Sequence, residues 1–199
     1  MKGLMAILLI LTAGFRSDEG GIGMNEYWVV ESNSRLKING SSNISPFQCD
    51  VLRYLHNDTL RFSPDVRTHQ LHFSQRSVTI DIAEIDCHHR YVTSDLRKTL
   101  KYQQYPHLKI HLIRMEDPSR TKPGQSLKGV VDIELGGHTK RIDIEYTLKS
   151  QTGRYFHLEG KRSLLFSDFK LEPPRKLAGL IRINEDLDVS VQLFFRRIG

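Results

Sequence analysis

Alternation of apolar and polar residues dominates the chain and predicts β-strands with one buried face. In residues 128–135 the apolar side chains fall on one face, with Val130 as the exception. Residues 141–148 alternate in the same way, and Gly136 and Gly137 lie between the two runs. Glycine tolerates the positive φ that tight turns need, so these two runs predict a β-hairpin.

Shorter alternating runs recur along the rest of the chain, at 27–30, 35–38, 59–62, 78–82, 108–112, 156–159 and 187–195. Together with the hairpin they give about eight strands, a number that closes into a small barrel. The register of each strand could still be shifted by one residue, which would exchange its two faces.

One segment, 93–104, reads as a helix rather than a strand. Thr93 or Ser94 can cap its N-terminus, Leu96 and Leu100 lie one turn apart, and Pro106 ends it. The predicted fold class is therefore all-β with one short helix: an antiparallel barrel of about eight strands, with the helix covering one end.

The N-terminus has the composition of an export signal. Residues 1–15 contain a lysine, a short apolar run over 4–11 and small residues at 12–14, which predicts a signal peptide. The apolar run is too short for a membrane span. Residues 16–26 read as a linker and 27–199 as one domain, because no second linker follows. The alternative is a hydrophobic N-terminus on a cytosolic protein.

The chain has two cysteines, Cys49 and Cys87, and they fit an exported protein. In an oxidising compartment an even count permits one disulfide, here Cys49–Cys87. The two do not form a CxxC pair, which argues against a metal or thioredoxin-type site. We therefore expect a periplasmic or secreted protein.

The net charge of +6 favours anionic partners, including acidic lipid headgroups. The basic residues are scattered, however, and no nucleic-acid-binding motif accompanies them, so no nucleic-acid partner is expected. A mildly basic, solvated surface is the simpler interpretation. The charge would also suit peripheral contact with an anionic membrane.

No catalytic or metal-binding constellation stands out. The chain has no G-x-S-x-G, Walker, H-E-x-x-H or Gly-rich dinucleotide motif. His107 and His111 would share one face of a strand, but the apolar alternates of that strand direct them outward, and zinc needs three or four converging ligands. We expect no catalytic residues, no metal and no cofactor.

Four phrases, in this order, resemble the YceI-like family. They are the strand 34–40 (SRLKING), the helix and following strand 94–100 (SDLRKTL) and 105–110 (YPHLKI), the hairpin 127–133 (LKGVVDI) with 137–140 (GHTK), and 166–169 (FSDF). Each phrase is weak alone, but their order and spacing are specific. The strands that carry Cys49 and Cys87 also resemble a two-cysteine branch of that family.

The resemblance implies a lipocalin-like barrel whose apolar interior accommodates a polyisoprenoid chain in some members. The expected lining is Leu36, Ile38, Ile80, Ile82, Leu108, Ile110, Val131, Ile133, Ile144, Tyr146, Phe156, Leu158, Val191 and Leu193. From the residues alone a filled core is the better interpretation, whereas the resemblance favours a cavity. Residues 52–56 are more polar than a lipid-lining strand would be, which leaves the identity of the ligand open.

The resulting hypothesis is a non-enzymatic carrier that holds an isoprenoid lipid or quinone inside the barrel. A phosphorylated headgroup would fit near Arg175, Lys176 or Arg182 at the barrel mouth. The alternative is a structural or interaction protein with the same barrel and a filled core. The sequence does not indicate an oligomeric state.

Overall fold

The structure is a computed structural model that describes residues 26–198, except for residues 76 and 177–179. The predicted signal peptide and nearly all of the predicted linker lie outside the described residues. The first strand begins at Glu26, the last residue assigned to the linker.

The described chain is almost entirely strand, with one α-helix and three short 3₁₀ turns. In chain order the elements are β1 (Glu26–Val30), β2 (Arg35–Ser42), β3 (Pro46–Val51), β4 (Thr59–Asp65), β5 (Gln70–Gln75), β6 (Ser77–Asp81), η1 (Ile82–Glu84), β7 (Ile85–Asp86), α1 (Arg90–Thr99), β8 (His107–Glu116), η2 (Pro118–Arg120), β9 (Ser126–Leu135), β10 (His138–Thr152), β11 (Tyr155–Leu165), η3 (Phe166–Phe169), β12 (Arg175–Lys176) and β13 (Ile181–Ile198).

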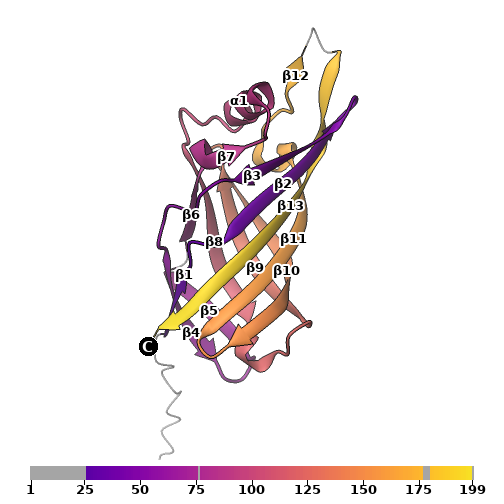
Figure 1. The fold of residues 1–199 in the computed structure, drawn as a ribbon. Coiled ribbons are helices and arrows are strands. Elements are labelled where there is room, and N and C mark those ends of the chain that lie inside the picture. Colours follow the sequence, from indigo (N-terminus) through magenta and orange to yellow (C-terminus); the bar gives the residue numbers. More distant parts are fainter. Residues whose placement is uncertain (1–25, 76, 177–179, 199) are drawn as a thin grey trace, which may run out of the picture.

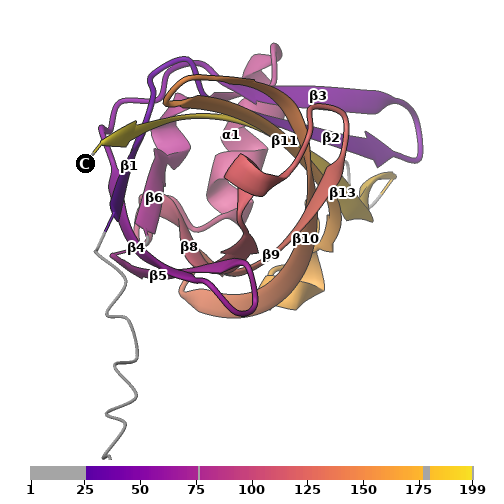
Figure 2. The ribbon, with the colours of Figure 1, turned by 90° about the horizontal axis from the view of Figure 1, so that it is seen from below.

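Eight strands close a ring in the order β1, β4, β5, β8, β9, β10, β11 and β13, and pairing of β13 with β1 completes it. Every pairing is antiparallel. Seen along its axis, the ring surrounds an interior with α1 behind it (Figure 2). The predicted antiparallel barrel of about eight strands, with a helix over one end, is confirmed.

The two ends of the barrel differ. At the helix end, α1 lies across the opening, and the β2–β3 hairpin and β12 project beside it (Figure 1). At the far end, only turns close the strands, among them the β4–β5 turn and η2 (Figure 1).

Two long strands change partners between the ends. β13 pairs with β1 through residues 195–198 and with β2 through residues 183–192. β8 pairs with β5 through residues 114–116 and with β6 through residues 107–111. One side of the wall therefore consists of two stacked sets of strands: β1, β4 and β5 at the far end, and β2, β3, β7 and β6 at the helix end.

The predicted hairpin is present as β9 and β10. Gly136 and Gly137 form its turn with φ of +58° and +83°, a conformation that favours glycine. A Cβ atom on Gly137 would also lie 2.5 Å from the Tyr105 ring, so the close approach of Tyr105 adds a second reason for glycine at this position.

The helix begins and ends earlier than the predicted range 93–104. Thr93 does not cap the helix, because it lies within the helical segment. Its hydroxyl accepts from Cys87 N (2.9 Å) and donates to Asp86 (3.1 Å). At the other end Lys101 adopts a left-handed conformation (φ 55°), which stops the helix before Pro106. The Thr93 hydroxyl thus bonds the segment before the helix instead of capping the helix as the sequence indicated.

Candidate functional site

The interior at the far end is filled by aromatic rings. Trp28 from β1 is 1% exposed and lies at the centre, with ring-centroid distances of 4.9 Å to Phe62 and 5.0 Å to Phe195. Phe73 and Phe156 lie 5.8 and 5.7 Å from it. The buried indole N–H has no acceptor among the described residues, so ring packing holds Trp28 in place. This end of the barrel is closed by its own core.

The interior at the helix end is aliphatic and contains a cavity of about 70 Å³. Side chains from the wall strands surround it, α1 contributes Leu96 and Leu100 from above, and η3 contributes Phe166 and Phe169. The remaining lining residues are Leu36, Ile38, Ile85, Leu108, Ile110, Ile133, Leu135, Leu164, Leu165, Leu171, Leu187 and Val189. Almost no polar surface faces this space.

Only some of the expected lining residues reach the cavity. The structure brings five of them together at the cavity: Leu36, Ile38, Leu108, Ile110 and Ile133. The others are buried or, for Ile144, half-buried in the core away from this cavity: Ile80, Ile82, Val131, Ile144, Tyr146, Phe156, Leu158, Val191 and Leu193. Ligand contact at any of these positions stays a prediction.

Tyr146 places a hydroxyl inside the barrel near the middle of β10. Its ring lies over Gly129 and Gly160 on the two neighbouring strands, where a Cβ atom would come within 2.9 and 2.8 Å of the ring. Among the described residues the hydroxyl has no hydrogen-bond partner. Burial alone raises the pKa of Tyr146 well above its usual range, so this phenol stays protonated.

A second apolar space, a groove of about 400 Å³, runs along the outer side of α1. It lies between the helix, Phe47 of the β2–β3 hairpin, and Pro174, Ile181 and Ile183 near β12 and the start of β13. Tyr91, Val92, His89 and Asp95 form its helical side. Sequence reasoning missed this groove because its walls come from four distant segments.

The groove and the internal cavity share two lining residues, Leu96 and Phe166. Both side chains are buried, at 3% and 2% exposure. Leu96 on α1 and Phe166 on η3 therefore border both apolar spaces.

The Cys49–Cys87 disulfide ties the start of α1 to the wall. Cys49 lies on β3, and Cys87 lies between β7 and the helix. Further along the helix, the Arg97 guanidinium donates to the carbonyl oxygens of Ala83 (2.6 Å) and Ile85 (2.8 Å). Both links hold α1 by the side that faces β7, and they leave its groove side without a covalent link.

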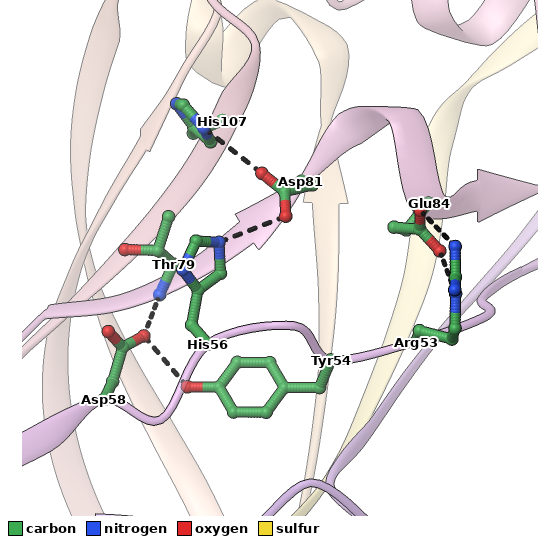
Figure 3. A network of polar contacts seen from close by, with 8 residues as sticks. All are labelled: Arg53, Tyr54, His56, Asp58, Thr79, Asp81, Glu84 and His107. Carbon is green, nitrogen blue, oxygen red and sulfur yellow. Dashed lines mark hydrogen bonds and ion pairs between the residues drawn. The ribbon is translucent and has the colours of Figure 1, made fainter.

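Residues 52–56, which are more polar than a lipid-lining strand would be, belong to a segment, 52–58, that forms no strand and connects β3 at the helix end to β4 at the far end. Figure 3 shows their polar contacts. Arg53 pairs with Glu84 (3.1 Å), and Asp58 accepts from the Tyr54 hydroxyl (2.8 Å) and from Thr79 N (2.6 Å). Burial, and then the Asp58 carboxylate, raise the pKa of Tyr54 above its usual range.

In the same segment His56 meets Asp81 at 3.1 Å, and His107 contacts the other oxygen of Asp81 at 3.1 Å (Figure 3). These side chains lie outside the barrel interior. Within the part of the chain that the structure describes, no cluster of histidines, cysteines and carboxylates could hold a metal ion. The arrangement fastens residues 52–58 to β6 and β8 and offers no reacting group to the cavity.

The predicted basic residues at the barrel mouth lie close to the groove. Arg175 and Arg182 face each other across the β12–β13 pair, and their neighbours Pro174, Ile181 and Ile183 line the groove. The side chain of Lys176 lies outside the described residues. Binding of a headgroup by these residues remains a prediction.

The ring of eight antiparallel strands, the covering helix and the apolar interior define a lipocalin-like β-barrel. Within the described residues, no helix has the length and apolar character needed to cross a bilayer. Residues 31–195 match the family described as the YceI-like domain. The chain belongs to the YceI-like family.

Solved structures show the same fold. A polyisoprenoid-binding domain from Saccharophagus degradans, implicated in plant cell wall breakdown, superposes with a TM-score of 0.62 at 15% identity, covering 85% of this chain and 97% of that one. Burkholderia cenocepacia BcnA gives 0.59 at 12% identity, covering 81% and 95%. A Campylobacter jejuni YceI protein gives 0.51 at 16% identity, covering 68% and 78%. No curated protein sequence matches the chain.

Proposed function

We propose that the protein binds a chain-like apolar molecule, an isoprenoid lipid or a quinone, at the helix end of the barrel and performs no catalysis. The observation that carries this proposal is the pair of apolar spaces that share Leu96 and Phe166 as lining residues. The family match and the polyisoprenoid-binding neighbour from Saccharophagus degradans support the same class of ligand.

The sizes of the two spaces suggest how such a chain is held. Ligand sites usually measure about 300–1,000 Å³, a range that includes the groove but not the 70 Å³ cavity. The chain would therefore lie in the groove and push its end past Leu96 and Phe166 into the barrel. Each methylene group that it buries contributes about 0.8 kcal/mol. The aromatic rings at the far end limit how far the chain can enter.

The alternative is a barrel with a filled core and no small-molecule ligand. The aromatic rings fill the interior at the far end, as this alternative requires. The two functions therefore differ in whether the aliphatic interior at the helix end takes up a ligand. The Cys49–Cys87 disulfide supports action in an oxidising compartment, the periplasm or the cell exterior.

Native mass spectrometry of the purified protein, before and after incubation with a polyprenol or a long-chain quinone, tests the proposal. We expect a bound hydrophobic molecule and tighter uptake than by a heat-unfolded control. Val189→Phe, which fills the cavity, should weaken uptake at least several-fold. A preparation that carries no hydrophobic molecule and takes up neither compound would favour the filled core.

A matched pair of truncations tests the route of entry. Leu96→Ala removes part of the barrier between groove and cavity, so uptake should become faster. Leu158→Ala makes the same chemical change at a fully buried position that borders neither space, and its uptake rate should stay that of the parent protein. Equal effects of both changes would place the entrance elsewhere.

A further inference from the structure

One side of α1 and the turn after it carry cations that have no carboxylate ion-pair partner among the described residues. Arg90, Arg97 and Lys98 on α1, and Lys101 in the following turn, line a polar cleft of about 830 Å³. Among the residues that the structure describes, Arg90, Lys98 and Lys101 have no ion-pair partner. Arg97 donates to backbone carbonyls, which leave its charge in place.

Asp86 also lines this cleft and contributes one negative charge; its Oδ1 atom accepts from the Thr93 hydroxyl and from His88 N. The four cations outnumber this one carboxylate, so the cleft has an excess of positive charge. The excess is a property of the described helix face and its turn, independent of the scattered basic residues elsewhere.

Some cations on the barrel wall are instead paired with carboxylates. Arg141 pairs with Asp132 at 2.8 Å, and Lys149 pairs with Glu159 at 2.9 Å. Arg196 at the far end pairs with Glu31 at 2.7 Å. Beside the helix that covers the barrel, by contrast, four cations line one cleft and none of them has a carboxylate ion-pair partner among the described residues.

The same end of the molecule exposes apolar side chains. Tyr91, next to Arg90, is 72% exposed, Ile44 at the tip of the β2–β3 hairpin is 67% exposed, and Leu180 beside β13 is 74% exposed. Asn43 joins the two tips, because its side-chain amide donates to Leu180 O (2.9 Å) and its Oδ1 accepts from Arg182 N (2.9 Å). Figure 1 shows α1 and the β2–β3 hairpin at this one end.

From these features we infer that the helix end docks on an anionic lipid bilayer. Lysine and arginine side chains near an anionic leaflet each contribute attraction, and tyrosine and aliphatic side chains insert at the interface. The biological role of docking rests on the proposed function: Tyr91 also lines the groove, so docking would present the groove to membrane lipids. The attraction to the bilayer depends only on the cationic and apolar side chains of this surface.

Vesicle sedimentation with the full chain tests the electrostatic part. Binding to phosphatidylcholine vesicles that contain phosphatidylglycerol should exceed binding to pure phosphatidylcholine and should fall as salt rises. Lys98→Gln with Lys101→Gln should weaken binding about thirtyfold, roughly fivefold per lysine. Lys122→Gln with Lys128→Gln makes the same change in net charge near the far end and should have little effect. Equal losses from the two pairs would overturn the inference.

A second matched pair tests the apolar part. Ile44→Asp places a charge at the exposed tip of the helix end and should weaken vesicle binding more than tenfold. Val66→Asp makes the corresponding change at a 73% exposed position in the β4–β5 turn of the far end and should leave binding unchanged. Binding that tolerates Ile44→Asp would contradict insertion at this end.

Uptake of a polyprenol delivered from cyclodextrin, without vesicles, separates this inference from the proposed function. Uptake that persists in a protein that does not bind anionic vesicles would overturn docking and leave the carrier function in place. Vesicle binding without any uptake would overturn the carrier function and leave docking in place.

Discussion

The far end of the barrel and its helix end are closed in different ways. At the far end, Trp28 and the phenylalanines around it form a continuous ring-on-ring core. At the helix end, aliphatic side chains surround a cavity, and a helix rather than a core covers the opening. Close-packed aromatic rings resist displacement, whereas a covering helix can move as a unit. One barrel can thus combine a stable base with an accessible interior.

The largest expected effect comes from removing the centre of the aromatic core. Trp28→Ala should lower the free energy of unfolding by about 3–5 kcal/mol, because it leaves a cavity among four rings. Urea denaturation followed by circular dichroism measures this loss. If the two ends are independent, uptake of the apolar ligand should persist below the unfolding transition; loss of both together would show that the ends act as one unit.

Loss of the disulfide should come next. Cys49→Ser with Cys87→Ser opens a loop with a sequence separation of 38 and should cost about 3–4 kcal/mol through the entropy of the unfolded chain. Amide hydrogen exchange should rise first in α1, since the bond ties the start of the helix to β3. Faster exchange at the far end instead would contradict the division between the ends. Added reductant should destabilise the parent protein and leave the serine variant unchanged.

Removing the Tyr146 hydroxyl should change the free energy of unfolding by a smaller amount and in the opposite direction. Its buried hydroxyl has no partner in the described chain, so Tyr146→Phe should stabilise the protein by about 1 kcal/mol. Burial raises the pKa of Tyr146, so the unfolded state releases this proton first and stability falls as pH rises past about 10. The phenylalanine variant should lose part of that decline.

Tyr54→Phe is the matched control for Tyr146→Phe. The Tyr54 hydroxyl donates to Asp58, so its removal should destabilise the protein at neutral pH. Unfolding curves of the two variants should therefore shift in opposite directions. A shift in the same direction would show that the Tyr146 hydroxyl also makes a stabilising contact.

The smallest effect is expected on the rim of the helix end. Lys140 holds the pKa of Asp168 below its usual range, and Leu165 N also donates to this carboxylate. The carboxylate therefore stabilises the fold at neutral pH, and this contribution is lost as pH falls through the lowered pKa. Asp168→Asn should cost about 0.5 kcal/mol at pH 7. The difference from the parent protein should disappear in acid; a difference that persists there would have another cause.

The sequence predicted the strands and their buried faces well, because a strand's period of two is set by its own backbone. It could not predict where each residue lies along the barrel axis. Leu36 and Leu193 show the same alternation, yet only Leu36 reaches the cavity. That difference depends on the register between strands that are far apart in the chain, which no local pattern specifies.

The outer groove could not be predicted from the sequence for the same reason, since Phe47, Val92 and Ile183 come together only in the folded chain. The cationic face of α1 could have been found. Arg90, Arg97, Lys98 and Lys101 have helical spacing in the sequence, but the predicted start at residue 93 excluded Arg90 and hid the pattern.

Because β8 and β13 exchange partners along their length, the two halves of the barrel share these long strands but not the strands that pair with them on this side of the wall. Hydrogen bonds from β13 to β1 and from β8 to β5 hold the far end, and a separate set, to β2 and to β6, holds the helix end. The β13–β2 pairing beside the cavity can therefore rearrange without breaking any bond between β13 and β1, while the Cys49–Cys87 disulfide keeps β3 beside the start of α1.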